Sequence, residues 1–146
     1  MALFLDANIP IYVAGRPHPL QAPCTRILEL VAHQPQAFLT NAEVLQELLH
    51  RYLSLRRWPE GQQIIEGFAR LMQGHIEPIT AADVLGATAL AEGHPGLSAR
   101  DLLHVAVLRR VGAAGIITAD ARFESVAGLR RFDPAQLDTW LAEMVG

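Results

Sequence analysis

The chain has 146 residues, of which 51% are hydrophobic and 18% are charged, and its formal net charge is −3. This length suits one domain with a substantial core, so we expect a single domain over residues 1–146. No stretch approaches the roughly 20 unbroken apolar residues of a membrane span. The first residues lack a basic region followed by a long apolar segment, so we expect no signal peptide and a cytoplasmic location.

The choice of charged and sulfur-containing residues excludes several classes of protein. All 12 basic residues are arginines, so the chain lacks the lysine that a P-loop places on phosphates and that phosphoaspartate receivers place beside their acceptor. The single cysteine, Cys24, excludes an internal disulfide and a thiolate metal site. The mild negative charge does not exclude a nucleic-acid partner, because four acids neutralised by a metal would leave a slightly positive remainder.

Short apolar strands alternate with amphipathic helices along the whole chain. We expect strands at residues 2–5, 37–39, 76–79, 115–118 and 129–132, the third of them at a sheet edge because it contains Pro78. We expect helices at residues 9–13, 21–33, 40–55, 60–73, 80–91 and 98–111, and a last helix that Asp133 and Pro134 begin. This alternation predicts an α/β fold of three layers, in which helices cover both faces of a mainly parallel sheet of about five strands.

Four carboxylates fall where such a sheet would gather them: Asp6, Glu47, Asp101 and Asp120. Asp6 and Asp120 follow strands that can be neighbours, and Asp101 lies in the first turn of a helix that Ser98 caps. Each acid alone also fits a cap, a turn or a solvated helix face. Together they would repel one another unless a cation lay between them, and their hard oxygen ligands suit Mg²⁺ or Mn²⁺.

Three further polar residues are secondary candidates for the same site. Asn8 lies in the turn after the first strand, and Thr118 either hydrogen-bonds a site carboxylate or only packs at the end of its strand. Thr40 and Glu43 have the spacing of a capping box, which accounts for Glu43 structurally. Glu47 lies one turn further along and has no such local explanation, so we favour Glu47 for chemistry.

Four stretches of the chain, in this order, match a known family: FLDAN at residues 4–8, VLQELL at 44–49, LSARDLLHVA at 97–106 and IITADARF at 116–123. Together they resemble the PIN-domain nucleases, and among these the small VapC-like toxins of type II toxin–antitoxin pairs. The resemblance implies that Asp6, Glu47, Asp101 and Asp120 are the metal-site acids, with Asp6 and Asp101 touching the ion directly. Asn41 stands where many relatives carry serine, which affects fine positioning rather than the set of ligands.

The resemblance also implies a function. It implies Mg²⁺- or Mn²⁺-dependent hydrolysis of phosphodiester bonds in RNA that leaves a 5′-phosphate and a 3′-hydroxyl, an antitoxin that covers the site, and a homodimer. A PIN-like module that holds RNA or protein without cutting, and DNA processing by the same chemistry, stay open as alternatives. The intact set of four acids favours the nuclease.

Other residues near the predicted site have two interpretations each. Arg51, Arg56, Arg57 and Trp58 form either an RNA-contacting rim or a solvated helix end with an anchoring tryptophan. His104 follows Asp101 by three residues, so it either flanks the site or is an interior histidine bonded to backbone. We favour the backbone-bonded role for His104.

Overall fold

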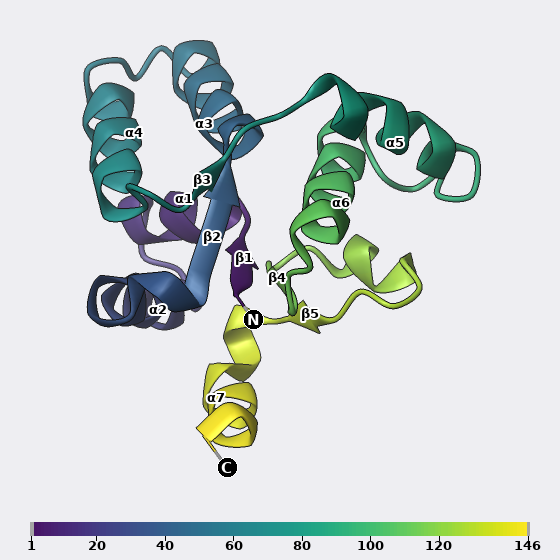
Figure 1. The fold of residues 1–146 in the computed structure, drawn as a ribbon. Helices are drawn as coiled ribbons and strands as arrows, with labels where there is room; N and C mark the ends of the chain where they lie inside the picture. Colours follow the sequence, from purple (N-terminus) through teal and green to yellow (C-terminus); the bar gives the residue numbers. More distant parts are fainter. Residues whose placement is uncertain (1, 146) are drawn as a thin grey trace.

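The computed structural model describes residues 2–145 and contains a five-stranded parallel sheet in the order β3-β2-β1-β4-β5 (Figure 1). The strands are β1 (Leu3–Leu5), β2 (Phe38–Asn41), β3 (Ile76–Glu77), β4 (Gly115–Ile117) and β5 (Arg131–Phe132). The residues of β1, β2 and β4 are all buried, as expected for parallel strands covered on both faces. The edge position predicted for the strand before Pro78 is confirmed.

Helices cover both faces of this sheet. They are α1 (Asn8–Ala14), α2 (Gln21–His33), α3 (Ala42–Ser54), α4 (Glu60–Leu71), α5 (Ala81–Ala91), α6 (Ala99–Val111) and α7 (Leu137–Val145). The chain steps from β1 through β2 to β3 in one direction and then returns to β4 on the other side of β1. Because such crossovers are right-handed, α1 to α4 lie on one face and α5 and α6 on the other (Figure 1). The predicted three-layer α/β/α architecture is therefore confirmed.

The core fixes the carboxyl ends of β1 and β4, which are adjacent inner strands. Phe4, Leu5, Ile116 and Ile117 are 0% exposed, and β1 pairs with β4 from Leu3 to Leu5. Burial of each such side chain contributes about 1.5–3 kcal/mol. The residues that follow β1 and β4 therefore start from a rigid base. Among residues 2–145, no helix combines the length and the apolar character needed to cross a bilayer.

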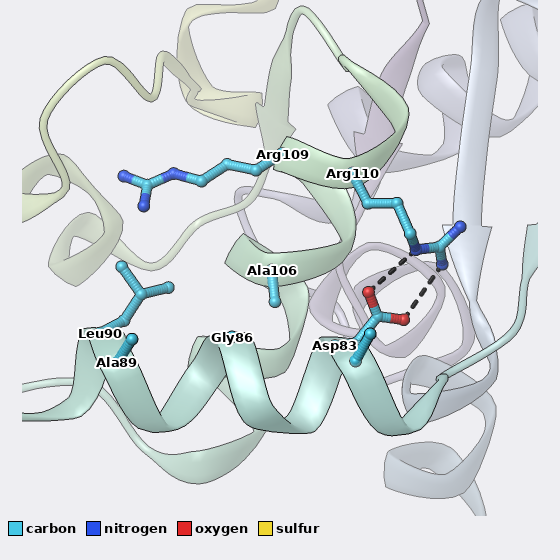
Figure 2. A pocket seen from close by; sticks show the side chains of 8 residues that line it. Asp83, Gly86, Ala89, Leu90, Ala106, Arg109 and Arg110 are labelled. Atoms are coloured by element: carbon cyan, nitrogen blue, oxygen red, sulfur yellow. Dashed lines mark hydrogen bonds and ion pairs between the residues drawn. The ribbon is translucent and has the colours of Figure 1, made fainter.

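The pair α5 and α6 forms most of the second face and is closely packed. A Cβ at Gly86 of α5 would lie 3.9 Å from the Cβ of Ala106 in α6, so the two helices approach closely at this point (Figure 2). Beside this contact, Arg110 of α6 binds the buried carboxylate of Asp83 in α5, with Nε 2.9 Å from Oδ1. These contacts hold the middle and the last turn of α6 against α5.

Two helix starts agree with the sequence prediction and two differ. The helices expected to begin near residues 80 and 98 do so, with capping boxes at Thr80 and Ser98. The capping box predicted at Thr40 is wrong, because β2 extends through Asn41 and Thr40 Oγ1 donates instead to the carbonyl of Leu5, at 3.0 Å. Asn41 is the N-cap of α3. At the C-terminal end, Asp133 caps the 3₁₀ turn η3 (Pro134–Gln136), and α7 begins only after it.

Candidate active site

A cavity of about 480 Å³ opens where the segments that follow β1 and β4 meet the middle of α3 and the first turn of α6. Its lining residues are Asp6, Asn8, Ile11, Tyr12, Glu47, Arg51, Ser98, Arg100, Asp101, Asp120 and Arg122. All four predicted acids are among them. The chain connections reverse direction on either side of β1, and such a switch point is where open α/β sheets bind ligands.

Asp6 is the most deeply buried of the four acids, at 6% exposure. Its Oδ1 accepts from the N–H of Ala7 at 2.8 Å, and its Oδ2 accepts from Thr118 Oγ1 at 2.7 Å and from Asn8 Nδ2 at 3.4 Å. Thr118 Oγ1 also accepts from the backbone N–H of Asp120 at 3.1 Å. Thr118 thereby connects the first and last acids, and Asn8 Nδ2 also donates to Thr118 Oγ1, at 2.8 Å. Burial raises the pKa of Asp6 above its ordinary value, despite the opposing effects of His104 and of Thr118.

Asp101 and Asp120 face each other across Arg122. The capping box fixes Asp101, because its Oδ2 accepts from the N–H of Ser98 at 2.9 Å. Nη2 of Arg122 lies 2.6 Å from Asp120 Oδ2 and 3.4 Å from Asp101 Oδ2. Hydrogen bonds from Arg122 lower the pKa of Asp120. The sequence prediction missed Arg122, although its position two residues after Asp120 in the matched stretch was a usable signal.

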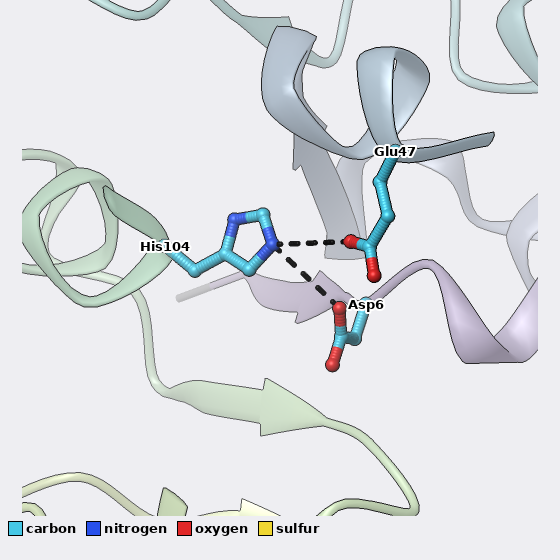
Figure 3. Close-up of side chains that lie close together, drawn as sticks. All are labelled: Asp6, Glu47 and His104. Carbon is cyan, nitrogen blue, oxygen red and sulfur yellow. Dashed lines mark ion pairs between the residues drawn. The ribbon is translucent and has the colours of Figure 1, made fainter. Parts of the chain in front are cut away.

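Glu47 enters the cavity from the second turn of α3, with its side chain 30% exposed. Beneath it lies His104 of α6, whose Nε2 is 3.7 Å from Asp6 Oδ1 and 3.9 Å from Glu47 Oε2 (Figure 3). The other ring nitrogen, Nδ1, lies 3.0 Å from Asn41 Nδ2. The expectation that His104 bonds to backbone is wrong, because its ring spans the space between Asn41 and the acids.

The donor atoms of this site fit a divalent cation. Ligand atoms of Asp6, Glu47 and His104 all lie within 4.8 Å of one another, and Asp101 and Asp120 line the same cavity. Carboxylate oxygens dominate the set, which is the chemistry that hard cations prefer. The raised pKa of Asp6 is a second sign of fit, since Glu47 contributes to it by repulsion and a cation would relieve that repulsion.

The remaining predicted residues are distributed unevenly around the cavity. Arg51 lines it. Glu43 lies outside the lining and faces Arg100, with 3.7 Å between carboxylate and guanidinium. The residues Arg56, Arg57 and Trp58 belong to the connection between α3 and α4 and do not line it. In that connection Arg57 binds Glu60, and Trp58 packs against the core.

An acidic, partly buried cluster at the switch point of a parallel sheet defines a class of α/β proteins suited to bind a divalent cation in an open cavity. The family model described as PIN domain matches residues 3–129. Ribonuclease VapC23 of Mycobacterium tuberculosis is 38% identical over 120 residues, covering 81% of this chain and 92% of the relative. Ribonuclease VapC13 of the same species is 33% identical over 129 residues, covering 88% and 98%.

A solved structure shares the fold at lower identity. The crystal structure of VapBC2 from Rickettsia felis bound to a promoter DNA fragment gives a TM-score of 0.70 at 19% identity, covering 91% of this chain and 98% of that one. The chain belongs to the PIN-domain family. The resemblance of the four sequence stretches is thereby confirmed.

Proposed function

We propose that this protein is a metal-dependent endoribonuclease that acts as the toxin of a toxin–antitoxin pair. The observation that carries the proposal is the meeting of Asp6, Glu47, Asp101 and Asp120 in one cavity, in a chain related to proteins named as ribonucleases. A module that only binds has no use for carboxylates that repel one another. The substrate is RNA, and the reaction is hydrolysis of a phosphodiester bond.

The four acids would hold Mg²⁺, with Mn²⁺ as a substitute. When bound, the ion supplies a more acidic water and neutralises negative charge on the phosphate. Thr118 and Asn8 hold the carboxylate of Asp6 in one orientation, and Ser98 does the same for Asp101. Glu47 is more exposed than Asp6 and faces the cavity, so it is placed to accept a proton from the attacking water.

The RNA strand would cross from this cavity into a second hollow beside it. That hollow, of about 300 Å³, shares Ile11, Glu47, Arg51 and Arg100 with the acidic cavity. Its other lining residues include His50 and Leu55. Phosphates of a strand lying along both hollows would pass Arg51 and Arg100, and guanidinium groups bind phosphate well. Contacts from Arg56, Arg57 and Trp58 would lie further along the same helix end.

The relatives support the assignment of partners. Two of them carry the name VapC, and the Rickettsia felis structure is a VapBC complex. These names support an antitoxin that covers the acidic cavity. A homodimer, a cytoplasmic location and a single PIN-like domain over residues 1–146 complete the proposal and rest on the sequence resemblance to the family.

Cleavage of a mixed pool of structured and single-stranded RNAs tests the proposed reaction. Purified protein is incubated with Mg²⁺, with Mn²⁺ and with chelator, beside the variants Asp6→Asn and Asp101→Asn. The matched control is Asp138→Asn, which changes an acid whose side chain is 84% exposed on α7. Metal-dependent cutting that leaves 5′-phosphate ends, and that Asp6→Asn and Asp101→Asn abolish while Asp138→Asn does not, supports the proposal.

Two results would contradict it. Binding of RNA without cutting by any form, together with absence of metal binding in calorimetry, would favour the binding module. Cutting of a parallel DNA pool but not of RNA would instead identify a DNA-processing enzyme.

A further inference from the structure

His104 lies directly beneath the acidic cluster and is 1% exposed. Its Nε2 is a buried nitrogen without a hydrogen-bond partner among residues 2–145, and it points between Asp6 and Glu47 (Figure 3). A buried nitrogen aimed at two acids has two possible roles. It either gives its lone pair to a metal ion as a third ligand, or carries a proton and holds the carboxylates. The tautomer of the ring decides between these roles.

Asn41 determines that tautomer through its second task as the N-cap of α3. Its Oδ1 accepts from the backbone N–H of Val44 at 2.9 Å. Because a backbone N–H can only donate, the side-chain oxygen of Asn41 must face the helix. The amide nitrogen of Asn41 is therefore the atom that faces His104, and the cap bond fixes this orientation of the amide.

The orientation of Asn41 dictates where the proton of the neutral imidazole resides. Nδ2 of Asn41 is a donor and lies 3.0 Å from His104 Nδ1, so Nδ1 must accept. A neutral ring that accepts at Nδ1 carries its proton at Nε2. Nε2 then has no lone pair for a metal ion. It presents an N–H to Asp6 Oδ1 at 3.7 Å and to Glu47 Oε2 at 3.9 Å.

We infer that His104 is a positioning residue that holds Asp6 and Glu47 through its Nε2–H, and that Asn41 sets this role by fixing the tautomer of the ring. The inference depends on the proposed function only in naming these two acids as metal-site residues. If either carboxylate moves several tenths of an ångström toward Nε2, it comes within hydrogen-bond distance of the Nε2–H. The metal is then left with oxygen ligands, which accords with Mg²⁺ or Mn²⁺ rather than with ions that prefer imidazole.

Packing around the imidazole of His104 fixes its orientation. Phe4 of β1 packs against the imidazole with 5.1 Å between ring centroids, and both rings are buried. The ring is therefore clamped between the core and Asn41, with one edge turned to the acids. Partners of this kind typically change metal affinity by about 10- to 100-fold when they are removed.

Nitrogen NMR of protein labelled with ¹⁵N-histidine reads the tautomer directly, without RNA. In the metal-free wild type we expect the signals of His104 to show a proton on Nε2 and none on Nδ1. Saturation with Mg²⁺ should leave that proton in place. A proton found on Nδ1, or loss of the Nε2 proton when Mg²⁺ is added, would overturn the inference.

Asn41→Asp is the matched variant for this measurement. Aspartate caps helices as well as asparagine does, so the start of α3 is retained, but it turns an acceptor toward His104 instead of a donor. We expect the proton signal to appear on Nδ1 in this variant. An unchanged Nδ1 signal in a folded Asn41→Asp protein would contradict the role of Asn41.

Substitutions of His104 itself provide a second test if Asn41→Asp fails to fold. Glutamine can place an amide N–H near the position of Nε2, whereas phenylalanine keeps a ring without a donor. We expect Mn²⁺ affinity, measured by calorimetry, to fall by about tenfold or more in His104→Phe and to recover in His104→Gln. Equal losses in both folded variants would overturn the positioning role.

These readouts separate the inference from the proposed function. If the protein binds metal and shows the expected tautomer but cuts no RNA, the proposed ribonuclease activity fails and the role of His104 stands. If RNA is cut while Nε2 loses its proton on metal binding, the proposed ribonuclease activity stands and the role of His104 fails.

Discussion

Arg122 binds Asp120 through two nitrogens, with Nε 3.0 Å from both carboxylate oxygens and Nη2 2.6 Å from Oδ2. The same guanidinium reaches Asp101 at 3.4 Å and the carbonyl of Gly96 at 3.3 Å. One arginine therefore places a positive charge between two acids that would otherwise attract a metal ion. A divalent cation bound as proposed would compete with Arg122 for these carboxylates.

Replacing Arg122 by glutamine should tighten metal binding. The substitution removes the competing charge, and the gain in Mn²⁺ affinity should reach at most about fivefold, because exposed ion pairs are worth up to about 1 kcal/mol. The pKa of Asp120 should rise toward its ordinary value, since hydrogen bonds from Arg122 hold it down. Calorimetric titration with Mn²⁺ measures the affinity.

A charge-matched control is Arg130→Gln, which removes an arginine that pairs with Glu143 away from the cavity. The affinity of this control should equal that of wild type. Weaker Mn²⁺ binding by Arg122→Gln than by Arg130→Gln would show that Arg122 supports the ion rather than competing with it.

Asp6→Asn should stabilise the metal-free protein at neutral pH while removing its metal response. Burial raises the pKa of Asp6 in the folded state. A carboxyl with a raised folded pKa contributes stability that is fully present below its unfolded pKa, about 3.9, and is lost as pH rises through the folded value. At pH 7 and in chelator, Asp6→Asn should therefore exceed the wild-type free energy of unfolding by about 1 kcal/mol.

Urea unfolding with and without Mg²⁺ measures this effect. The advantage of Asp6→Asn should shrink below about pH 4, where the wild-type carboxyl is protonated in both states. Added Mg²⁺ should stabilise wild type and leave the variant unchanged. A variant that is less stable than wild type in chelator at pH 7 would contradict the assigned cost of burying Asp6.

Local patterns predicted most of this fold and part of the site. The strand ending at Asp6 and the capping box that holds Asp101 depend on residues within a few positions of each other, so the sequence alone sufficed. Thr40 was wrongly predicted as the cap of the helix because threonine and asparagine both cap helices. Only the pairing of β2 with its neighbours shows which of the two residues still belongs to the strand.

Contacts between distant segments were beyond such patterns. His104 takes its role from Asn41, 63 residues earlier, and no spacing within α6 indicates that contact. The link between Arg122 and Asp101 likewise exists only because the end of β4 folds beside the first turn of α6. The acids were predictable because they follow the strands and helix starts, whereas the groups that organise them depend on tertiary packing.

Asp83 should contribute to stability without affecting chemistry. It is 3% exposed, accepts from the N–H of Thr80 in the capping box of α5, and accepts two hydrogen bonds from Arg110 (Figure 2). These bonds lower the pKa of Asp83, so its contribution is present above the unfolded pKa of about 3.9 and is lost as pH falls through the folded value. Asp83→Asn should lower the free energy of unfolding at pH 7 by about 1–3 kcal/mol, as expected for loss of hydrogen bonds to a charged group.

Unfolding in urea at pH 7 and at pH 3 measures this contribution, with Glu143→Gln as an exposed control. The difference between wild type and Asp83→Asn should be smaller at pH 3 than at pH 7. A difference that does not depend on pH would show that the asparagine side chain destabilises the protein for steric rather than electrostatic reasons.

Arg51 and Arg100 should each contribute one phosphate contact to RNA binding. Both line the acidic cavity and the adjoining hollow, so a strand along the two would pass them in turn. Because each neutralised phosphate of a single strand releases counterions, Arg51→Ala or Arg100→Ala should reduce the slope of log affinity against log salt by about 0.7. The measurement uses a labelled RNA in the cleavage-deficient Asp101→Asn background, at several salt concentrations.

The control for this prediction is Arg26→Ala, because Arg26 lies on α2, pairs with Asp138 of α7 and is absent from both hollows. A general effect of net charge would lower RNA affinity equally in Arg26→Ala and in the two cavity variants. A local contact would leave the salt slope of Arg26→Ala unchanged while those of Arg51→Ala and Arg100→Ala fall. The proposed path requires RNA phosphates at Arg51 and Arg100 and none at Arg26. Equal salt slopes in all three variants would therefore show that the RNA strand does not run along the two hollows.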